Sequence, residues 1–120
     1  MSQKTNSKLY DLEETTYKFA QAVIMLTKEL PRTTANIEIS KQLIRASGSV
    51  GANYIEANEA LGKKDFLLHI KISRKEAKES RYWLRLLDIE DEALDKERQT
   101  LTGEAQELMN IFGAILRKSE

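Results

Sequence analysis

Residues 66–87 read FLLHIKISRKEAKESRYWLRLL, and their spacing decides the fold of this chain. Small or apolar side chains recur here in alternating steps of four and three, at Phe66, Ile70, Ser73, Ala77, Ser80, Leu84 and Leu87. Such steps place side chains on one face of an α-helix, and no alternation of period two competes with them. The stretch therefore predicts an amphipathic helix with one buried face.

The same spacing occurs in three other segments of the chain. The first segment carries Leu12, Thr16, Phe19, Val23, Leu26 and Leu30. The second carries Leu43, Ser47, Val50, Tyr54, Ala57 and Leu61. The last carries Leu101, Ala105, Leu108, Phe112 and Ile115. Short connections between amphipathic helices favour antiparallel neighbours, so we predict an all-α fold, an antiparallel up-and-down four-helix bundle.

Helix-breaking residues fall between the predicted segments. Pro31 follows the first segment and cannot continue a helix. Good N-cap residues for the second helix come next, at Thr33, Thr34 and Asn36. We expect Gly62 to end the second helix as its C′ residue, and the acidic stretch 88–99 to connect the last two helices.

Length and composition fit one soluble domain. The 120 residues are 41% hydrophobic and 32% charged, and 19 basic residues balance 19 acidic ones. The absence of cysteine excludes disulfides and thiolate metal sites. We expect a flexible N-terminal tail over residues 1–8, because this stretch is polar, and a single four-helix-bundle domain over residues 9–120. Neither a secretory signal nor a membrane-spanning run is apparent, which predicts a cytoplasmic protein with no membrane partner.

The sequence shows no constellation of catalytic or metal-binding residues. His69 is the single histidine, fewer than the Glu-x-x-His pairs of a ferritin-like metal bundle require. No phosphate-binding glycine loop and no serine-nucleophile motif is present. We therefore expect no enzyme, no catalytic residue, no metal and no cofactor.

Two of the helices carry more apolar residues than one buried face requires. With successive residues 100° apart, the second segment has an additional stripe of Ile37, Ile44, Gly48, Gly51 and Ile55. The third segment has an additional stripe of Leu68, Ile72, Trp83 and Leu86. A wide core face would absorb these residues. Exposed contiguous apolar surface usually marks a contact, however, so the stripes predict an interface between subunits of a homo-oligomer.

The two glycines of the second segment support close packing. A glycine inside a helix costs about 1 kcal/mol relative to alanine. Gly48 and Gly51 therefore suggest that another helix or a ligand approaches closely at their positions. The alternative is a kink at Ser47-Gly48-Ser49, because glycine and serine pairs are known kink sites.

Charge is distributed unevenly along the chain. Residues 62–88 carry eight cations against four acids, and residues 89–120 carry four cations against eight acids. The cations of the third helix share one arc, which includes Lys64, Lys71, Arg74, Lys75, Lys78, Arg81 and Arg85. Such a row can follow a phosphate backbone, so we predict a non-enzymatic homo-oligomer that binds RNA or DNA through this face. The alternative is that the acidic stretch 88–97 or another subunit neutralises the face, which leaves an oligomeric adaptor that binds only protein.

Residues 42–57, QLIRASGSVGANYIEA, resemble the signature of the four-helix-bundle proteins encoded in 23S rRNA intervening sequences. Residues 63–66, 75–80 and 82–84 resemble the third helix of that family, and residues 89–120 match it only in helical pattern. The resemblance implies a left-handed bundle that assembles as a ring-like homopentamer with a central channel. It also implies a relation to the accessory proteins of diversity-generating retroelements, which pair with a reverse transcriptase and nucleic acid. Those proteins are strongly basic, whereas this chain is neutral.

Overall fold

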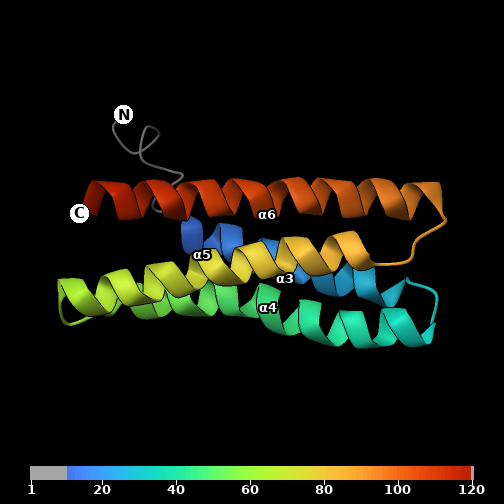
Figure 1. The fold of residues 1–120 in the computed structure, drawn as a ribbon, viewed down its shortest axis with the longest axis horizontal. Coiled ribbons are helices and arrows are strands. Elements are labelled where there is room, and N and C mark those ends of the chain that lie inside the picture. Colours follow the sequence, from blue (N-terminus) through green and yellow to red (C-terminus); the bar gives the residue numbers. More distant parts are fainter. Residues whose placement is uncertain (1–10, 120) are drawn as a thin grey trace.

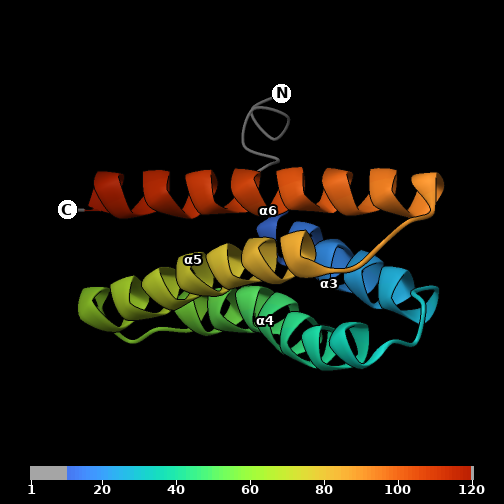
Figure 2. The same ribbon diagram turned by 45° about the vertical axis from the view of Figure 1, so that its right-hand side comes forward.

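The computed structural model describes residues 11–119, so the tail expected over residues 1–8 lies outside the described residues. Four helices follow one another: α3 (Leu12–Lys28), α4 (Thr34–Asn58), α5 (Lys63–Leu86) and α6 (Glu92–Ser119). They run antiparallel along one long axis (Figures 1 and 2), and no strand occurs within this range. Consecutive helices pack side by side, and α6 returns to contact α3. The predicted all-α four-helix bundle is confirmed.

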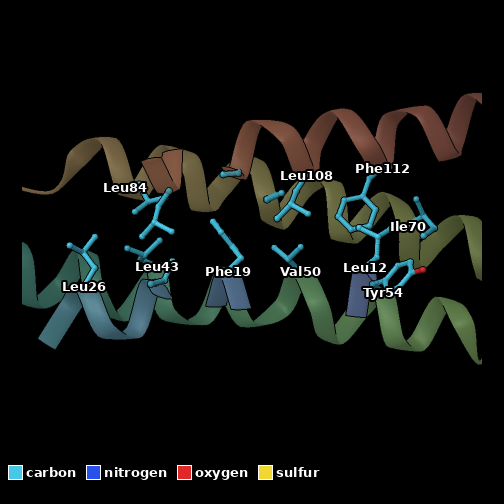
Figure 3. Packing of buried hydrophobic residues seen from close by; sticks show 14 of the residues in the cluster. Leu12, Phe19, Leu26, Leu43, Val50, Tyr54, Ile70, Leu84, Leu108 and Phe112 are labelled. Atoms are coloured by element: carbon cyan, nitrogen blue, oxygen red, sulfur yellow. The ribbon is translucent and has the colours of Figure 1, made fainter. Parts of the chain in front are cut away.

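The predicted apolar stripes of the four helices meet in a common core. Phe19 of α3 and Phe112 of α6 are its largest fully buried side chains. The ring of Tyr54 from α4 packs against Phe112, with ring centroids 6.0 Å apart (Figure 3). Phe66 and Ile115 lie at the margin, where they are half-buried against the cluster. The period of four and three therefore identified the buried face of every helix.

Asn36 joins the two connections at one end of the bundle. Thr33 is the N-cap of α4, because its side chain accepts a hydrogen bond of 3.1 Å from the backbone N–H of Asn36. The buried carboxamide of Asn36 donates to the carbonyl oxygens of Pro31 and Asp88. It also accepts from the backbone N–H of Asp88 at 2.9 Å. Asn36 is therefore a structural link between loops rather than a cap.

The end of α4 differs from the prediction. The helix ends at Asn58, so Leu61 lies in the following loop and is fully exposed instead of buried. The N–H of Glu59 closes the helix by donating to carbonyls of the preceding turn. Gly62 has an extended backbone and serves as the N-cap residue of α5. The expected C′ role of Gly62 is wrong, because the last turn closes without a left-handed residue.

The last helix begins earlier than expected. Only residues 87–91 connect α5 to α6, whereas a connection over 88–99 was expected. Asp91 accepts a hydrogen bond of 2.9 Å from the backbone N–H three residues later, as an N-cap side chain does. Glu92 and Asp95 lie in the first turn, where negative charge is favourable. The acidic stretch is therefore a helix N-terminus rather than a connection.

Gly51 marks a close approach between α3 and α4. A Cβ atom at Gly51 would lie 2.7 Å from Oγ1 of Thr16 and 3.1 Å from its Cβ. The Thr16 hydroxyl is fixed by a 2.7 Å hydrogen bond to the carbonyl of Leu12. The helix that approaches Gly51 thus belongs to the same chain. A Cβ at Gly48, by contrast, would meet no described atom within 4 Å.

The two glycines are expected to respond in opposite ways to alanine. Gly51→Ala should lower the melting temperature, because overpacking against Thr16 costs about 1–3 kcal/mol and exceeds the gain in helix propensity. Gly48→Ala is the matched control and should stabilise the protein by about 1 kcal/mol. Thermal unfolding followed by circular dichroism measures both effects. Equal stabilisation by the two substitutions would contradict the close approach at Gly51.

Candidate functional site

Acidic and basic side chains of α5 occupy different sides of the helix. The acidic residues Glu76 and Glu79 turn toward α4, where Arg45 donates to them at 3.5 and 3.1 Å. Glu76 is only 7% exposed, and a buried carboxylate is costly unless it is paired. Arg45 therefore neutralises the two glutamates of α5. These glutamates are then not the partners of the cations on the same helix.

Six of the predicted cations line two hollows between α5 and α6. The first hollow, of about 340 Å³, is lined by Lys71, Arg74, Lys75, Lys78, Met109 and Leu116. The second, of about 390 Å³, is lined by Arg81, Arg85, Arg98, Gln99 and Thr102. Lys64 is exposed in the first turn of α5 and lines neither hollow. We call the two hollows together the α5/α6 groove, and no acidic residue is among their lining residues.

The predicted cations form no ion pair within residues 11–119. In the acidic stretch, Asp95 pairs with Arg98 of its own helix rather than with α5. Arg98 also donates to the carbonyl oxygens of Leu84 and Leu87, both at 3.1 Å, and so satisfies the C-terminal end of α5. Neutralisation of the basic face by residues 88–97 of the same chain is therefore not found in this range.

Sequence reasoning missed Arg117 of α6. A Cβ atom at Gly113 would lie 3.5 Å from Nη1 of Arg117 and 3.8 Å from Nε of Arg74. Both guanidinium groups thus approach the same point on the backbone of α6. Residues 89–120 carry more acidic than basic residues, so nothing in the composition of this segment assigned Arg117 to a basic site. The available signal was the spacing of four residues between Gly113 and Arg117, which puts them on one helix face.

The additional apolar stripe of α4 lies on the side of α3. Ile37 and Ile44 line a hollow of about 290 Å³ that also includes Thr27 of α3. Ile24 is one turn before Thr27 and is 40% exposed. We call this surface the α3/α4 face, and its exposed members are Ile24, Ile37, Ile44, Gly48 and Ile55. Gly51 belongs to the same stripe, but the side chain of Thr16 from α3 packs against it.

The additional apolar stripe of α5 lies next to α4, on the side of α4 that faces away from α3. It shares one side of α5 with Glu79, and Arg45 of α4 contacts Glu79. Leu68 and Leu86 are 52% and 45% exposed. Ile72 and Trp83 are half-buried, and the Nε1 donor of Trp83 has no acceptor among residues 11–119. We call Leu68, Ile72, Trp83 and Leu86 the α4/α5 face.

His69 is held between α4 and α5. Its Nδ1 lies 3.1 Å from Oδ1 of Asn53, and its Nε2 lies 3.4 Å from Oδ1 of Asp65. Both ring nitrogens therefore have partners in the same chain, one on α4 and one at the exposed start of α5. Over residues 11–119, no three histidine, aspartate or glutamate side chains are grouped so as to hold a metal ion. Within the same range, no helix has the length and apolarity needed to cross a bilayer.

A hollow of about 240 Å³ at the contact between α3 and α6 combines apolar and acidic side chains. Its lining residues are Leu12, Thr15, Phe19, Glu104, Glu107, Leu108 and Ile111. Burial raises the pKa of Glu104 above its usual value, with a smaller contribution from the charge of Glu107. Glu104 is still exposed, so its ionisation is disfavoured in the folded state relative to the unfolded chain only modestly.

Known proteins share both the sequence pattern and the fold. Residues 10–114 match the family described as 23S rRNA-intervening sequence protein. A crystal structure from Bacteroides thetaiotaomicron, of a protein with unknown function from the S23 ribosomal protein family, has a TM-score of 0.75 and 29% sequence identity. The similarity covers 87% of this chain and 96% of that chain. A comparison with curated proteins finds no match.

Removing the charge of Glu104 is expected to stabilise the protein at neutral pH. Because the folded-state pKa is raised, ionisation of Glu104 weakens the fold above that pKa, and the penalty vanishes below the unfolded value of 4.5. Glu104→Gln should raise the melting temperature at about pH 7 and lose this advantage at about pH 4. Glu97→Gln, at another exposed position of α6 that does not line this hollow, serves as the control. An advantage that does not change between the two pH values would contradict the assignment.

Proposed function

The chain belongs to the family of 23S rRNA-intervening sequence proteins, and from this premise we propose that it is a cytoplasmic, non-enzymatic homo-oligomer that binds RNA through the α5/α6 groove. The observation that carries the proposal is the row of cations along this groove, which no described acid neutralises. Such a row favours a ligand that supplies several negative charges in line. A phosphate backbone is that kind of ligand.

The dimensions and chemistry of the groove support an RNA ligand. From Lys71 to Arg85 the helix is about 21 Å long at 1.5 Å per residue, enough to follow several phosphates. Tyr82 is 54% exposed on the same arc of α5. Its ring packs edge-to-face against Trp83, with ring centroids 5.1 Å apart, and its exposed part is offered for stacking on an unpaired base. Proteins recognise RNA through this combination of backbone contacts and stacking on single-stranded bases.

The two apolar faces support self-association. The α3/α4 face and the α4/α5 face lie on either side of α4, so they are different surfaces of one subunit. A contact between two different surfaces is head-to-tail, and head-to-tail contacts close into rings when the rotation allows it. This arrangement accords with the ring-like homopentamer that the family resemblance implies.

An adaptor that binds only protein is the alternative function. The exposed side chains of the two apolar faces favour it, because they would suit a partner protein as well as a second copy of the chain. The adaptor makes no use of the cations in the α5/α6 groove. Binding of RNA therefore separates the two functions.

Affinity for a structured RNA is expected to fall steeply with salt. Each phosphate contact contributes about 0.7–0.9 to the slope of log K against log salt concentration, so several contacts give a slope of several units. Charge reversal by Arg74→Glu with Lys78→Glu should abolish binding in a gel-shift titration. Lys18→Glu with Lys96→Glu is the matched control, because these exposed lysines lie on α3 and α6 and line neither hollow of the groove. Salt-independent binding, no binding, or equal effects of both pairs would reject the RNA proposal.

The mass of the protein in solution is expected to be a multiple of the mass of one chain. Ile44→Glu and Leu68→Glu should each shift the mass toward the monomer, because each places a charge in one of the two apolar faces. Thr100→Glu, at an exposed position of α6 outside both faces, should leave the mass unchanged. Light scattering measures all four proteins. A monomeric mass for the natural protein would reject the interface.

A further inference from the structure

We propose that Arg74 of α5 and Arg117 of α6 form a clamp for a single phosphate group at the backbone of Gly113. The proposal rests on the function proposed above and names one point at which a phosphate of the RNA is bound. It differs from a diffuse basic surface because it requires two particular guanidinium groups from two helices.

The clamp follows from the convergence of two like charges. Nη1 of Arg117 and Nε of Arg74 lie 3.5 and 3.8 Å from the same point, the Cβ position of Gly113. Neither arginine pairs with an acid among residues 11–119. The two atoms are therefore at most about 7.3 Å apart, the sum of these two distances. Like charges at such a separation repel, and an anion between them converts this repulsion into attraction. Guanidinium groups suit a phosphate, because each can donate two parallel hydrogen bonds to its oxygens.

Gly113 marks the place where the two arginines meet. It is buried in α6, and a Cβ atom there would touch both guanidinium groups at ordinary van der Waals distance. Met109 and Leu116, one turn to either side of Gly113, line the hollow that Arg74 also lines and contribute apolar atoms to it. An apolar surrounding strengthens charge-assisted hydrogen bonds, because water competes less there.

The charges around the clamp are also favourable for an anion. Lys71 and Lys78 flank Arg74 by one turn in each direction and line the same hollow. The glutamates of α6 that precede the clamp, Glu104 and Glu107, line the hollow on the side of α3 instead. An incoming phosphate thus meets cations on α5 and no carboxylate among the residues that line this hollow.

A structural role for Arg117 makes a different prediction. Arg117 lies in the last turn of α6, where any cation is favourable to the helix dipole. In that role lysine would replace arginine without loss, and Lys118 would be equivalent to Arg117. In the clamp, lysine loses the planar pair of donors, and Lys118 has no part.

Titration of the full-length protein with inorganic phosphate tests the clamp directly. Phosphate, compared with chloride at equal ionic strength, should shift the Nε–H resonances of Arg74 and Arg117 in NMR spectra. Arg117→Gln should remove the shift at Arg74, and Arg117→Lys should weaken it. Lys118→Gln is the matched control and should leave it unchanged. If phosphate shifts neither arginine, or if Arg117→Gln leaves the shift at Arg74 intact, the clamp is overturned.

A second titration with the structured RNA separates the clamp from the proposed function. Arg117→Gln should weaken RNA binding about tenfold, as expected for loss of a charged hydrogen bond, and lower the salt slope by about 1. Lys118→Gln should have a much smaller effect. Equal weakening by both variants overturns the clamp while RNA binding stands. A further outcome is that the natural protein binds phosphate at the two arginines and binds no RNA. That result supports the clamp as a site for free phosphate, and it rejects the RNA function.

Discussion

The close packing of α4 against both of its neighbours is the constraint on which the other features of this structure depend. On one flank, Gly51 leaves room only for Thr16 of α3. On the other flank, the buried hydroxyl of Ser73 from α5 donates to the backbone carbonyl of Val50 at 2.9 Å. Small residues at both contacts bring the helices together, since the distance between packed helices follows the size of the side chains at their contact. The additional apolar stripes of α4 and α5 lie on other arcs of these helices, outside the contacts, where they contribute to the two apolar faces.

The same packing separates the charges of α5. Arg45 of α4 reaches both Glu76 and Glu79, so the acids of α5 are neutralised on one flank. The cations remain on the flank of α6, and the groove there has no acid in its lining. A formal net charge of +0 for the whole chain therefore hides a local positive field. Local field, rather than total charge, determines where an anion is attracted.

The sequence predicts the buried faces well because helical periodicity depends only on local spacing. The misplaced boundaries depend instead on individual hydrogen bonds, such as the one that Asp91 accepts at the start of α6. Gly48 and Gly51 are equivalent in the pattern, and only the path of α3 shows that Thr16 meets the second of them. Arg117 belongs to an acidic segment in the sequence. It becomes part of a basic site only because the antiparallel pairing of α5 with α6 places it beside Arg74.

The arrangement of the surfaces would link the proposed assembly to the proposed RNA binding. The two apolar faces flank α4, whereas Arg74 and Arg117 meet on the side of α6. Contacts made through the flanks of α4 would thus leave the meeting point of the two arginines uncovered in every subunit. A ring would repeat this groove once per chain, and an RNA that reached several copies would gain from effective concentration. Under the RNA function proposed above, weak individual phosphate contacts would then be sufficient, even for a chain with no net charge.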